Sequence, residues 1–306
     1  MEGHSDGNER HPFSSAASPV GREFVDTVPQ KDLSRCCLPS NVCELLVVRH
    51  GLTEYNKLHR LQGQLDIPLN DEGREQCRAC GREVKRMFAN PATGEIDVDV
   101  VYSSPLSRTA ESTEIICRES GILSSRIRHD PRIMEWNAGI LQGYLLSEIQ
   151  EKFPAEWALW RKKRDPDYIF PGGESLRMRY ARVASFFSEI VRNQQGKRVL
   201  VVTHGGVLDE LFRIIKRVPL TTSTNAPKLN AEVHVVRAEL MAEMQSSTRP
   251  LLDSTPAENG SFSQGEEARG DCHVQWTIVR WGKVKDPQNI PAGSCSAQVP
   301  NAIEYV

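Results

Sequence analysis

The chain has 306 residues, of which 39% are hydrophobic and 25% are charged, so it is long enough to bury a sizeable core. Its formal net charge of −2 is typical neither of a disordered chain nor of a general nucleic-acid binder, which would carry a basic surplus. No stretch approaches the roughly 18 consecutive apolar residues of a membrane-spanning helix. The composition therefore favours a folded protein without a nucleic-acid or membrane partner.

Three segments of the chain lack apolar periodicity. We expect a flexible N-terminal arm over residues 1–40, a low-complexity acidic insertion over 241–271 and a flexible tail over 285–306. Their net charges are −2, −4 and −1, which leaves about +5 on the rest of the chain and weakly favours an anionic ligand. The arm resembles neither a secretion signal nor an acid-poor transit peptide, so we expect a cytoplasmic protein, with organellar targeting by the arm left open.

Between these segments, short apolar strands alternate with amphipathic helices. Strands are predicted over residues 44–48, 98–102, 198–202, 233–236 and 274–281. Helices are predicted from an Asn70 cap to about Phe88, from Pro105 through Ile116, over 176–190 and over 208–215. This alternation predicts a single three-layer α/β/α domain over residues 41–284, with a mostly parallel central sheet flanked by helices.

The cysteines do not form a secreted disulfide framework. Cys77 and Cys80 have the spacing of metal ligands, but the sequence places neither a second pair nor a histidine near them. On one helix face they are better interpreted as small buried thiols, and no metal site is predicted.

Polar side chains follow three of the predicted strands. The first strand ends in Arg49-His50-Gly51, and the strand at 198–202 leads into Thr203-His204-Gly205-Gly206. The middle strand leads into Ser103-Ser104 and then Arg108 at the start of a helix, where main-chain N–H groups favour an anion. Because the carboxyl ends of parallel strands meet at one edge of a sheet, we expect these groups to lie close together.

The order of the motifs resembles the histidine phosphatase superfamily, and more narrowly its phosphoglycerate-mutase-like branch. The motifs are Arg-His-Gly-x-Thr-x-x-Asn, Gln62-Gly63, Ser-Ser-x-x-x-Arg, a hydrophobic residue two before Glu135, Gly-Gly-Glu-Ser and Thr-His-Gly-Gly. The resemblance covers about residues 43–217. It returns at 229–236 and 276–281, where the chain looks like plant phosphoglycerate-mutase-like proteins with metal-independent phosphoserine phosphatase activity.

The resemblance implies a role for each matching residue. His50 would attack phosphorus as the nucleophile, and Arg49, Arg108 and His204 would bind the phosphoryl oxygens. Glu135 would protonate the departing alkoxide and then accept a proton from water. The residues expected to position the substrate are Asn56, Gln62, Gly63 and Gly205. No cofactor and no metal are implied, because the arginines and histidines supply the positive charge.

Several assignments have alternatives in the sequence itself. Glu148, Glu151 and Glu174 could each replace Glu135 as the acid, although Glu174-Ser175 also fits a turn and a helix N-terminus. The basic run at 161–164 fits either a lid over the substrate or a solvated helix end. The Asp97-Val98-Asp99 sequence precedes its strand and lacks a following Thr, so we exclude it as a two-aspartate phosphatase motif.

The resemblance implies hydrolysis of a small phosphomonoester, with phosphoserine as one candidate. The alternatives are mutase-type phosphoryl transfer and a catalytically weak scaffold or sensor of the same fold. Trp160 and Glu174 are only 14 residues apart, which is too short for the insertion of true mutases and favours a site open to water. The expected partner is a small phosphorylated metabolite. Homodimerisation stays open, because relatives are often dimers.

Overall fold

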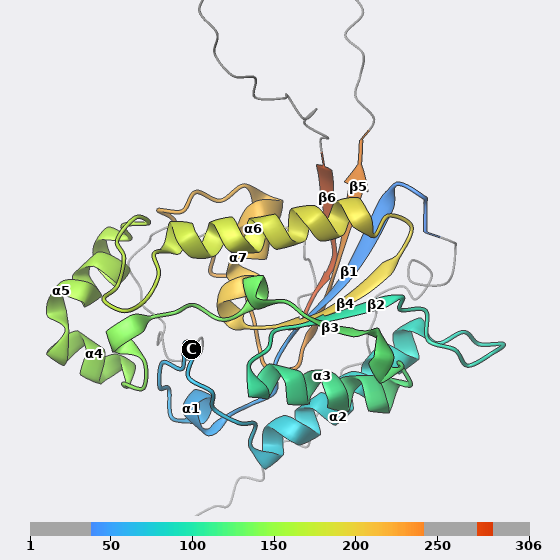
Figure 1. Ribbon diagram of the computed structural model, residues 1–306, viewed down its shortest axis with the longest axis horizontal. Coiled ribbons are helices and arrows are strands. Elements are labelled where there is room, and N and C mark those ends of the chain that lie inside the picture. Colours follow the sequence, from blue (N-terminus) through green and yellow to red (C-terminus); the bar gives the residue numbers. More distant parts are fainter. Residues whose placement is uncertain (1–37, 242–273, 284–306) are drawn as a thin grey trace, which may run out of the picture. The chain divides into compact units, whose positions relative to one another are not determined.

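A six-stranded sheet of order β3-β2-β4-β1-β5-β6 forms the centre of the computed structural model, which describes residues 38–241 and 274–283 (Figure 1). The strands are β1 (Val42–Arg49), β2 (Val100–Ser103), β3 (Ile127–His129), β4 (Arg198–Thr203), β5 (Val233–Leu240) and β6 (Val274–Trp281). The predicted tail lies outside the described residues, as do the predicted arm and insertion apart from 38–40 and 241.

Four neighbouring strands are parallel, namely β3, β2, β4 and β1, whereas β5 and β6 are antiparallel to their neighbours. The predicted mostly parallel sheet is confirmed. Strand β3 was not predicted from the sequence, because its three residues are half-buried or exposed and form no apolar run.

Helices and single helical turns connect the strands. The α-helices are α1 (Glu54–Lys57), α2 (Asp71–Phe88), α3 (Ser107–Ser120), α4 (Leu146–Lys152), α5 (Pro154–Trp157), α6 (Leu176–Asn193) and α7 (Gly205–Lys216). The 3-10 turns are η2 (Ser124–Arg126), η3 (Pro131–Ile133) and η4 (Gly139–Leu141), and η5 (Ala158–Lys163) is a π-helical turn. None of the helices in the described ranges is both long and apolar enough to cross a bilayer.

The helices cover the two faces of the sheet, α6 and α7 on one and α2 and α3 on the other (Figure 1). The strand pleat decides the partition. In β1, Leu45 and Val47 pack against the α6/α7 layer, and Leu46 and Val48 pack against the α2/α3 layer. Burial on both faces explains why β1 and β4 are continuous apolar runs, and it confirms the three-layer α/β/α fold.

Local sequence signals set the start of two long helices. The Asn70 side chain caps α2 by accepting a hydrogen bond from Gly73 N at 2.8 Å. The Ser175 hydroxyl caps α6 by accepting one from Met178 N at 3.2 Å. The start predicted at Pro105 for α3 is early, because Leu106 has an extended backbone and helical geometry begins at Ser107. Cys77 and Cys80 lie in the core on the inner face of α2, as predicted.

A small third cluster of apolar side chains lies beyond the carboxyl ends of β1 and β4. Helix α4 contributes aliphatic side chains to it, whereas α5 and the turn η5 contribute Trp157 and Trp160. These side chains pack with Leu61, Trp136 and Leu141. Figure 1 shows these short helices beside the N-terminal end of α6. Their packing therefore ties this part of the chain to the loop that carries Glu135.

A buried ionic cluster joins the opposite ends of the same strands. The Glu44 carboxylate of β1 is fully buried and accepts from Arg198 at 2.6 Å and from Arg237 at 2.7 Å. Arg198 also pairs with Asp97, and its main-chain N–H donates to Asp99. These two aspartates thus bind the start of β4, which agrees with their exclusion as a phosphatase motif.

Candidate active site

Two histidines meet where neighbouring parallel strands end. His50 directly follows β1 and His204 directly follows β4, and these strands pair with each other. Their ring centroids are 5.2 Å apart and both side chains are buried. Strand β2, on the other side of β4, leads into the turn before Arg108 of α3. The sheet order therefore brings together the three predicted strand-end motifs.

The hydrogen bond of His50 defines its tautomer. Nδ1 lies 2.7 Å from the carbonyl oxygen of Gly51, and because a carbonyl only accepts, Nδ1 carries the hydrogen. Burial lowers the pKa of His50 well below its usual value, and the charges of Arg108 and Arg49 lower it further. The ring is therefore neutral near pH 7, with the lone pair on Nε2.

Two buried arginines flank this ring. Arg49 Nη1 donates to the carbonyl of Lys228 at 2.9 Å, and Arg108 donates to the carbonyls of Leu65 and Gly63, both at 2.7 Å. Within the described chain, the buried Nε of each arginine has no hydrogen-bond partner. Burial lowers the pKa of both groups, to about 10 for Arg108, while the Glu135 carboxylate acts in the opposite direction. Both remain cationic at neutral pH.

His204 is held from one side of its ring. Nε2 lies 2.8 Å from the Ser104 hydroxyl and 3.1 Å from the Thr109 hydroxyl. Nδ1 is buried and has no partner in the described part of the chain. Burial, Arg108, His50 and Arg49 all lower the pKa of this ring, so it is neutral as well. The site thus combines two neutral imidazoles with two guanidinium cations.

Glu135 lies beside this cluster, on the loop after η3. Its carboxylate accepts from the main-chain N–H of Trp136 at 2.7 Å and of Gly206, in the first turn of α7, at 3.2 Å.

The alternative carboxylates have other partners or lie exposed. Glu148 caps α4 through Leu145 N and lies 3.5 Å from Arg60, and Glu151 is exposed. Glu174 binds Arg182. Of the four candidates, Glu135 is the one whose charge acts on both Arg49 and Arg108.

The predicted substrate-positioning residues surround the cluster. The Thr53 hydroxyl lies within hydrogen-bond distance of both Asn56 Oδ1, at 3.1 Å, and Gln62 Oε1, at 3.0 Å. Gly63 has a positive φ of 53°, and its carbonyl binds Arg108. A Cβ atom at Gly205 would lie 3.5 Å from Arg49 Nε, so this glycine borders the arginine directly. Gly63 therefore orients a phosphate-binding candidate through its carbonyl.

The loop before β5 also belongs to the site, although its residues were not among those predicted. The Lys228 carbonyl binds Arg49, and the Asn230 amide donates to the carbonyl oxygen of His50 at 2.8 Å. The Ala231 N–H donates to the Arg49 carbonyl at 2.9 Å. Residues 229–236 were already part of the family resemblance, but contacts made by main-chain carbonyls leave no residue-type signal.

The basic run at 161–164 fits neither sequence interpretation completely. The Arg161 guanidinium stacks on the ring of Trp160 at 4.2 Å, whereas Lys162 and Lys163 are exposed. Burial lowers the pKa of Arg161 to about 10. The run thus has one arginine packed against the aromatic cluster and two solvated lysines.

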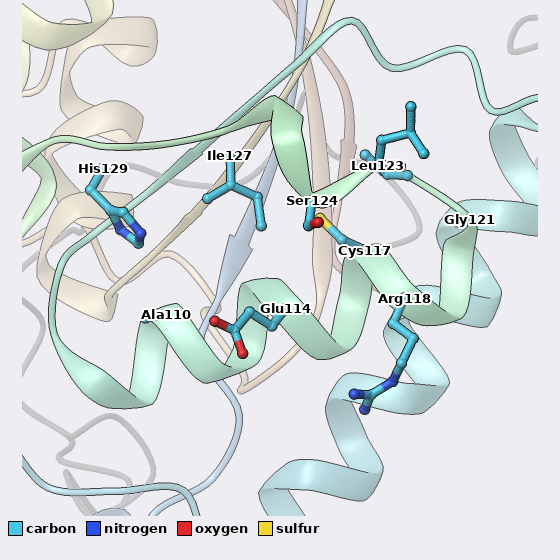
Figure 2. A pocket seen from close by; sticks show the side chains of 10 residues that line it. Ala110, Glu114, Cys117, Arg118, Gly121, Leu123, Ser124, Ile127 and His129 are labelled. Carbon is cyan, nitrogen blue, oxygen red and sulfur yellow. The ribbon is translucent and has the colours of Figure 1, made fainter.

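A groove of about 800 Å³ lies elsewhere, between α3, η2 and β3 (Figure 2). Glu114, Arg118 and His129 are among the residues that line it. None of the predicted site residues lines this groove. The described ranges contain no group of three His, Cys, Asp or Glu side chains suited to a metal ion.

Comparison with known proteins agrees with this geometry. Residues 45–242 match the family model of the histidine phosphatase superfamily (branch 1). The chain belongs to this superfamily. It is 31% identical over 219 residues to the metal-independent phosphoserine phosphatase of Arabidopsis thaliana, a match that covers 71% of this chain and 86% of that protein. It is 33% identical over 193 residues to phosphoglycerate mutase-like protein 4 of the same plant, with coverages of 61% and 79%.

Solved structures of other proteins have a similar fold. A mycobacterial glucosyl-3-phosphoglycerate phosphatase in complex with VO3 superposes with a TM-score of 0.56 at 23% identity. The alignment covers 78% of this chain and 98% of that one. The names of the relatives indicate phosphatase or mutase activity for the superfamily members that this chain resembles.

Proposed function

We propose that this protein is a phosphatase that hydrolyses a small phosphomonoester through a phosphohistidine on His50, without a metal ion. The observation that carries this proposal is the protonation and hydrogen bonding of the buried histidines and arginines. His50 presents a neutral ring with a lone pair on Nε2. Around it lie three buried N–H or ring nitrogen atoms that lack partners in the described residues, Arg49 Nε, Arg108 Nε and His204 Nδ1. The two guanidinium N–H groups suit the oxygens of a phosphoryl group, as does His204 Nδ1 in the tautomer that carries its hydrogen there.

The reaction has two steps. In the first, the lone pair of His50 Nε2 forms a bond to phosphorus as the bond to the ester oxygen breaks, and the Glu135 carboxylic acid gives its proton to the leaving alkoxide. In the second, the Glu135 carboxylate takes a proton from water, whose oxygen bonds to phosphorus while the N–P bond breaks. Phosphate and neutral His50 result. The two arginines hold the charge of the phosphoryl oxygens throughout.

The nucleophile assignment is tested with His50→Ala, assayed in EDTA for phosphate release. We expect no turnover above background in the variant and full turnover in the wild type, since the arginines rather than a metal ion stabilise the charge. His129→Ala, on the exposed edge strand β3, is the matched control and should keep wild-type activity. When the phosphate of the substrate carries 32P, the label should be trapped on the wild type alone, as an acid-labile and base-stable phosphohistidine. Substantial turnover by His50→Ala contradicts the mechanism.

Phosphoserine is the first substrate to test, because the relative from Arabidopsis thaliana with 31% identity is a metal-independent phosphoserine phosphatase. The alternative is mutase-type phosphoryl transfer, which the similarity to a phosphoglycerate mutase-like protein supports. The two are separated with 3-phosphoglycerate. A phosphatase releases glycerate or ignores the compound, whereas conversion to 2-phosphoglycerate favours the mutase.

A further inference from the structure

The Arg182 side chain of α6 binds the loop that carries Glu135. Its Nη1 donates to the carbonyls of Arg132 at 2.8 Å and Met134 at 2.7 Å, and its Nη2 donates to the carbonyl of Glu135 at 3.0 Å. One guanidinium thus holds three main-chain carbonyls within a stretch of four residues. With its two bonds to Glu174, Arg182 uses all five of its N–H groups, whereas a lysine ammonium has only three N–H donors on one atom.

Glu174 binds the other side of the same loop. Its carboxylate accepts from Arg182 Nη2 at 2.6 Å and Nε at 3.0 Å, and also from the main-chain N–H of Asn137 at 3.0 Å. The Glu174 main chain adds two bonds, its N–H donating to the Asn137 carbonyl at 2.9 Å and its carbonyl accepting from Trp136 Nε1 at 3.1 Å. The Glu174–Arg182 pair is only partly exposed, with side-chain exposures of 11% and 19%.

These contacts decide where the Glu135 carboxylate lies. That carboxylate binds the N–H of its own neighbour, Trp136, and the N–H of Gly206 across the site. Its position therefore depends on the path of the main chain from 132 to 137, which the Glu174–Arg182 pair holds on both sides of Glu135.

We propose that Arg182 and Glu174 are positioning residues for Glu135. They hold the general acid within reach of the leaving oxygen, but they do not themselves contact the phosphoryl group. The inference rests on the proposed function, in which Glu135 is the acid. It also explains the Gly-Gly-Glu-Ser motif, whose glutamate would act on the loop and whose serine caps α6.

The test compares esters that differ in their need for an acid. An alkyl phosphate such as phosphoserine needs a proton on its leaving oxygen, whereas p-nitrophenyl phosphate leaves as a stabilised phenolate. For Arg182→Lys and Glu174→Gln, we expect kcat/KM to fall about ten- to hundredfold with the alkyl ester, because general acid catalysis contributes about 10²–10⁴-fold. With the aryl ester the loss should be below about threefold. Glu135→Gln should give the same pattern at larger amplitude.

Arg177→Gln is the matched control, since Arg177 lies on the same helix and pairs with Asp167 at the surface. It should leave both esters unaffected. The positioning role is overturned if kcat/KM falls equally for both esters in the Arg182 and Glu174 variants, or falls for neither. This holds even if His50→Ala confirms the phosphohistidine. Far-UV circular dichroism checks folding, and Glu174→Gln, which keeps the side-chain shape, decides the question if Arg182→Lys unfolds. If Glu135→Gln itself lowers kcat/KM equally for both esters, Glu135 is not the general acid, and the positioning role is contradicted as well.

Discussion

Gly206 is the residue whose lack of a side chain leaves room for the Glu135 carboxylate. A Cβ atom built at Gly206 would lie 2.2 Å from Glu135 Oε1 and 3.0 Å from Arg179 Nη1. Carbon and oxygen cannot approach so closely, so a side chain here would displace the flexible end of Glu135 while the main chain stays in place. The same glycine also donates its N–H to this carboxylate.

Gly206→Ala should therefore separate activity from stability. We expect kcat/KM for an alkyl phosphate to fall about a hundredfold, the effect of misplacing a catalytic group by about 1 Å. The free energy of unfolding should stay level or rise by up to about 1 kcal/mol, because alanine favours a helix over glycine. Steady-state kinetics and denaturant unfolding measure the two quantities. Wild-type activity in this variant would show that the carboxylate does not need its observed place.

Residue types at strand ends carry a strong signal, and contacts through the main chain carry none. Arg49, His50 and His204 could be predicted because each directly follows or ends a buried apolar run, and the structure brings them together. The partners that orient them could not. The carbonyls of Gly63 and Lys228 bind the two arginines, and any residue type offers a carbonyl. The roles of the site residues remain predictions that the kinetic tests address.

At the scale of elements, the antiparallel pair β5 and β6 contains a buried histidine outside the active site. His234 of β5 packs on the ring of Trp281 of β6 at 4.5 Å, and neither of its nitrogens has a partner within the described chain. Burial, with a contribution from Arg280, lowers the pKa of His234 to about 3. A histidine in the unfolded chain has a pKa near 6.5, so between these values the unfolded state binds a proton that the folded state does not.

This histidine should make the fold sensitive to acid. As the pH falls from 6.5 towards 3, the free energy of unfolding should decrease by about 1.4 kcal/mol per pH unit from this group. His234→Phe keeps an aromatic ring against Trp281 and removes the titration. The difference in unfolding free energy between variant and wild type should therefore widen in favour of the variant as the pH falls, while contributions from His50 and His204 cancel.

Urea unfolding at pH 7, 6, 5 and 4 measures this difference. His129→Gln is the control, since His129 is exposed on β3 and its removal should give a curve parallel to that of the wild type. Parallel curves for His234→Phe and wild type would contradict the buried, neutral state of His234.

Long periodic elements could be predicted from the sequence and short ones could not. Asn70 and its periodic face gave the bounds of α2, and the steps of four and three gave α6. Helices α4 and α5 have seven and four residues, too few for a periodic signal. Their place depends on tertiary packing in the third apolar cluster, where their side chains pack with Leu61 and Trp136. The antiparallel direction of β5 likewise depends on the pairing with β1, which local sequence does not specify.

At the scale of the whole molecule, the fold consists of two stretches of sequence that meet in one sheet. Residues 38–241 supply five strands and residues 274–283 supply β6. Leu240 of β5 and Val274 of β6 are paired across the two strands, so the ends of the connecting segment start from adjacent positions. Trp281 of β6 donates to the Pro227 carbonyl at 2.7 Å, next to the loop that binds Arg49. The second stretch therefore helps to fix the loop that binds Arg49.

Because Leu240 and Val274 are neighbours, a short turn can make the connection now made by residues 242–273. Replacing these residues with a four-residue turn shortens the loop about eightfold, and each halving lowers the entropic cost of closure by about 0.6 kcal/mol. We expect the free energy of unfolding to rise by about 1–2 kcal/mol, with kcat/KM unchanged, since the site residues proposed above lie in the retained chain. Thermal and urea unfolding, together with phosphate release, measure both quantities. A clear loss of stability would show that the segment contributes contacts worth more than the closure entropy, and a loss of activity alone would place part of it at the active site.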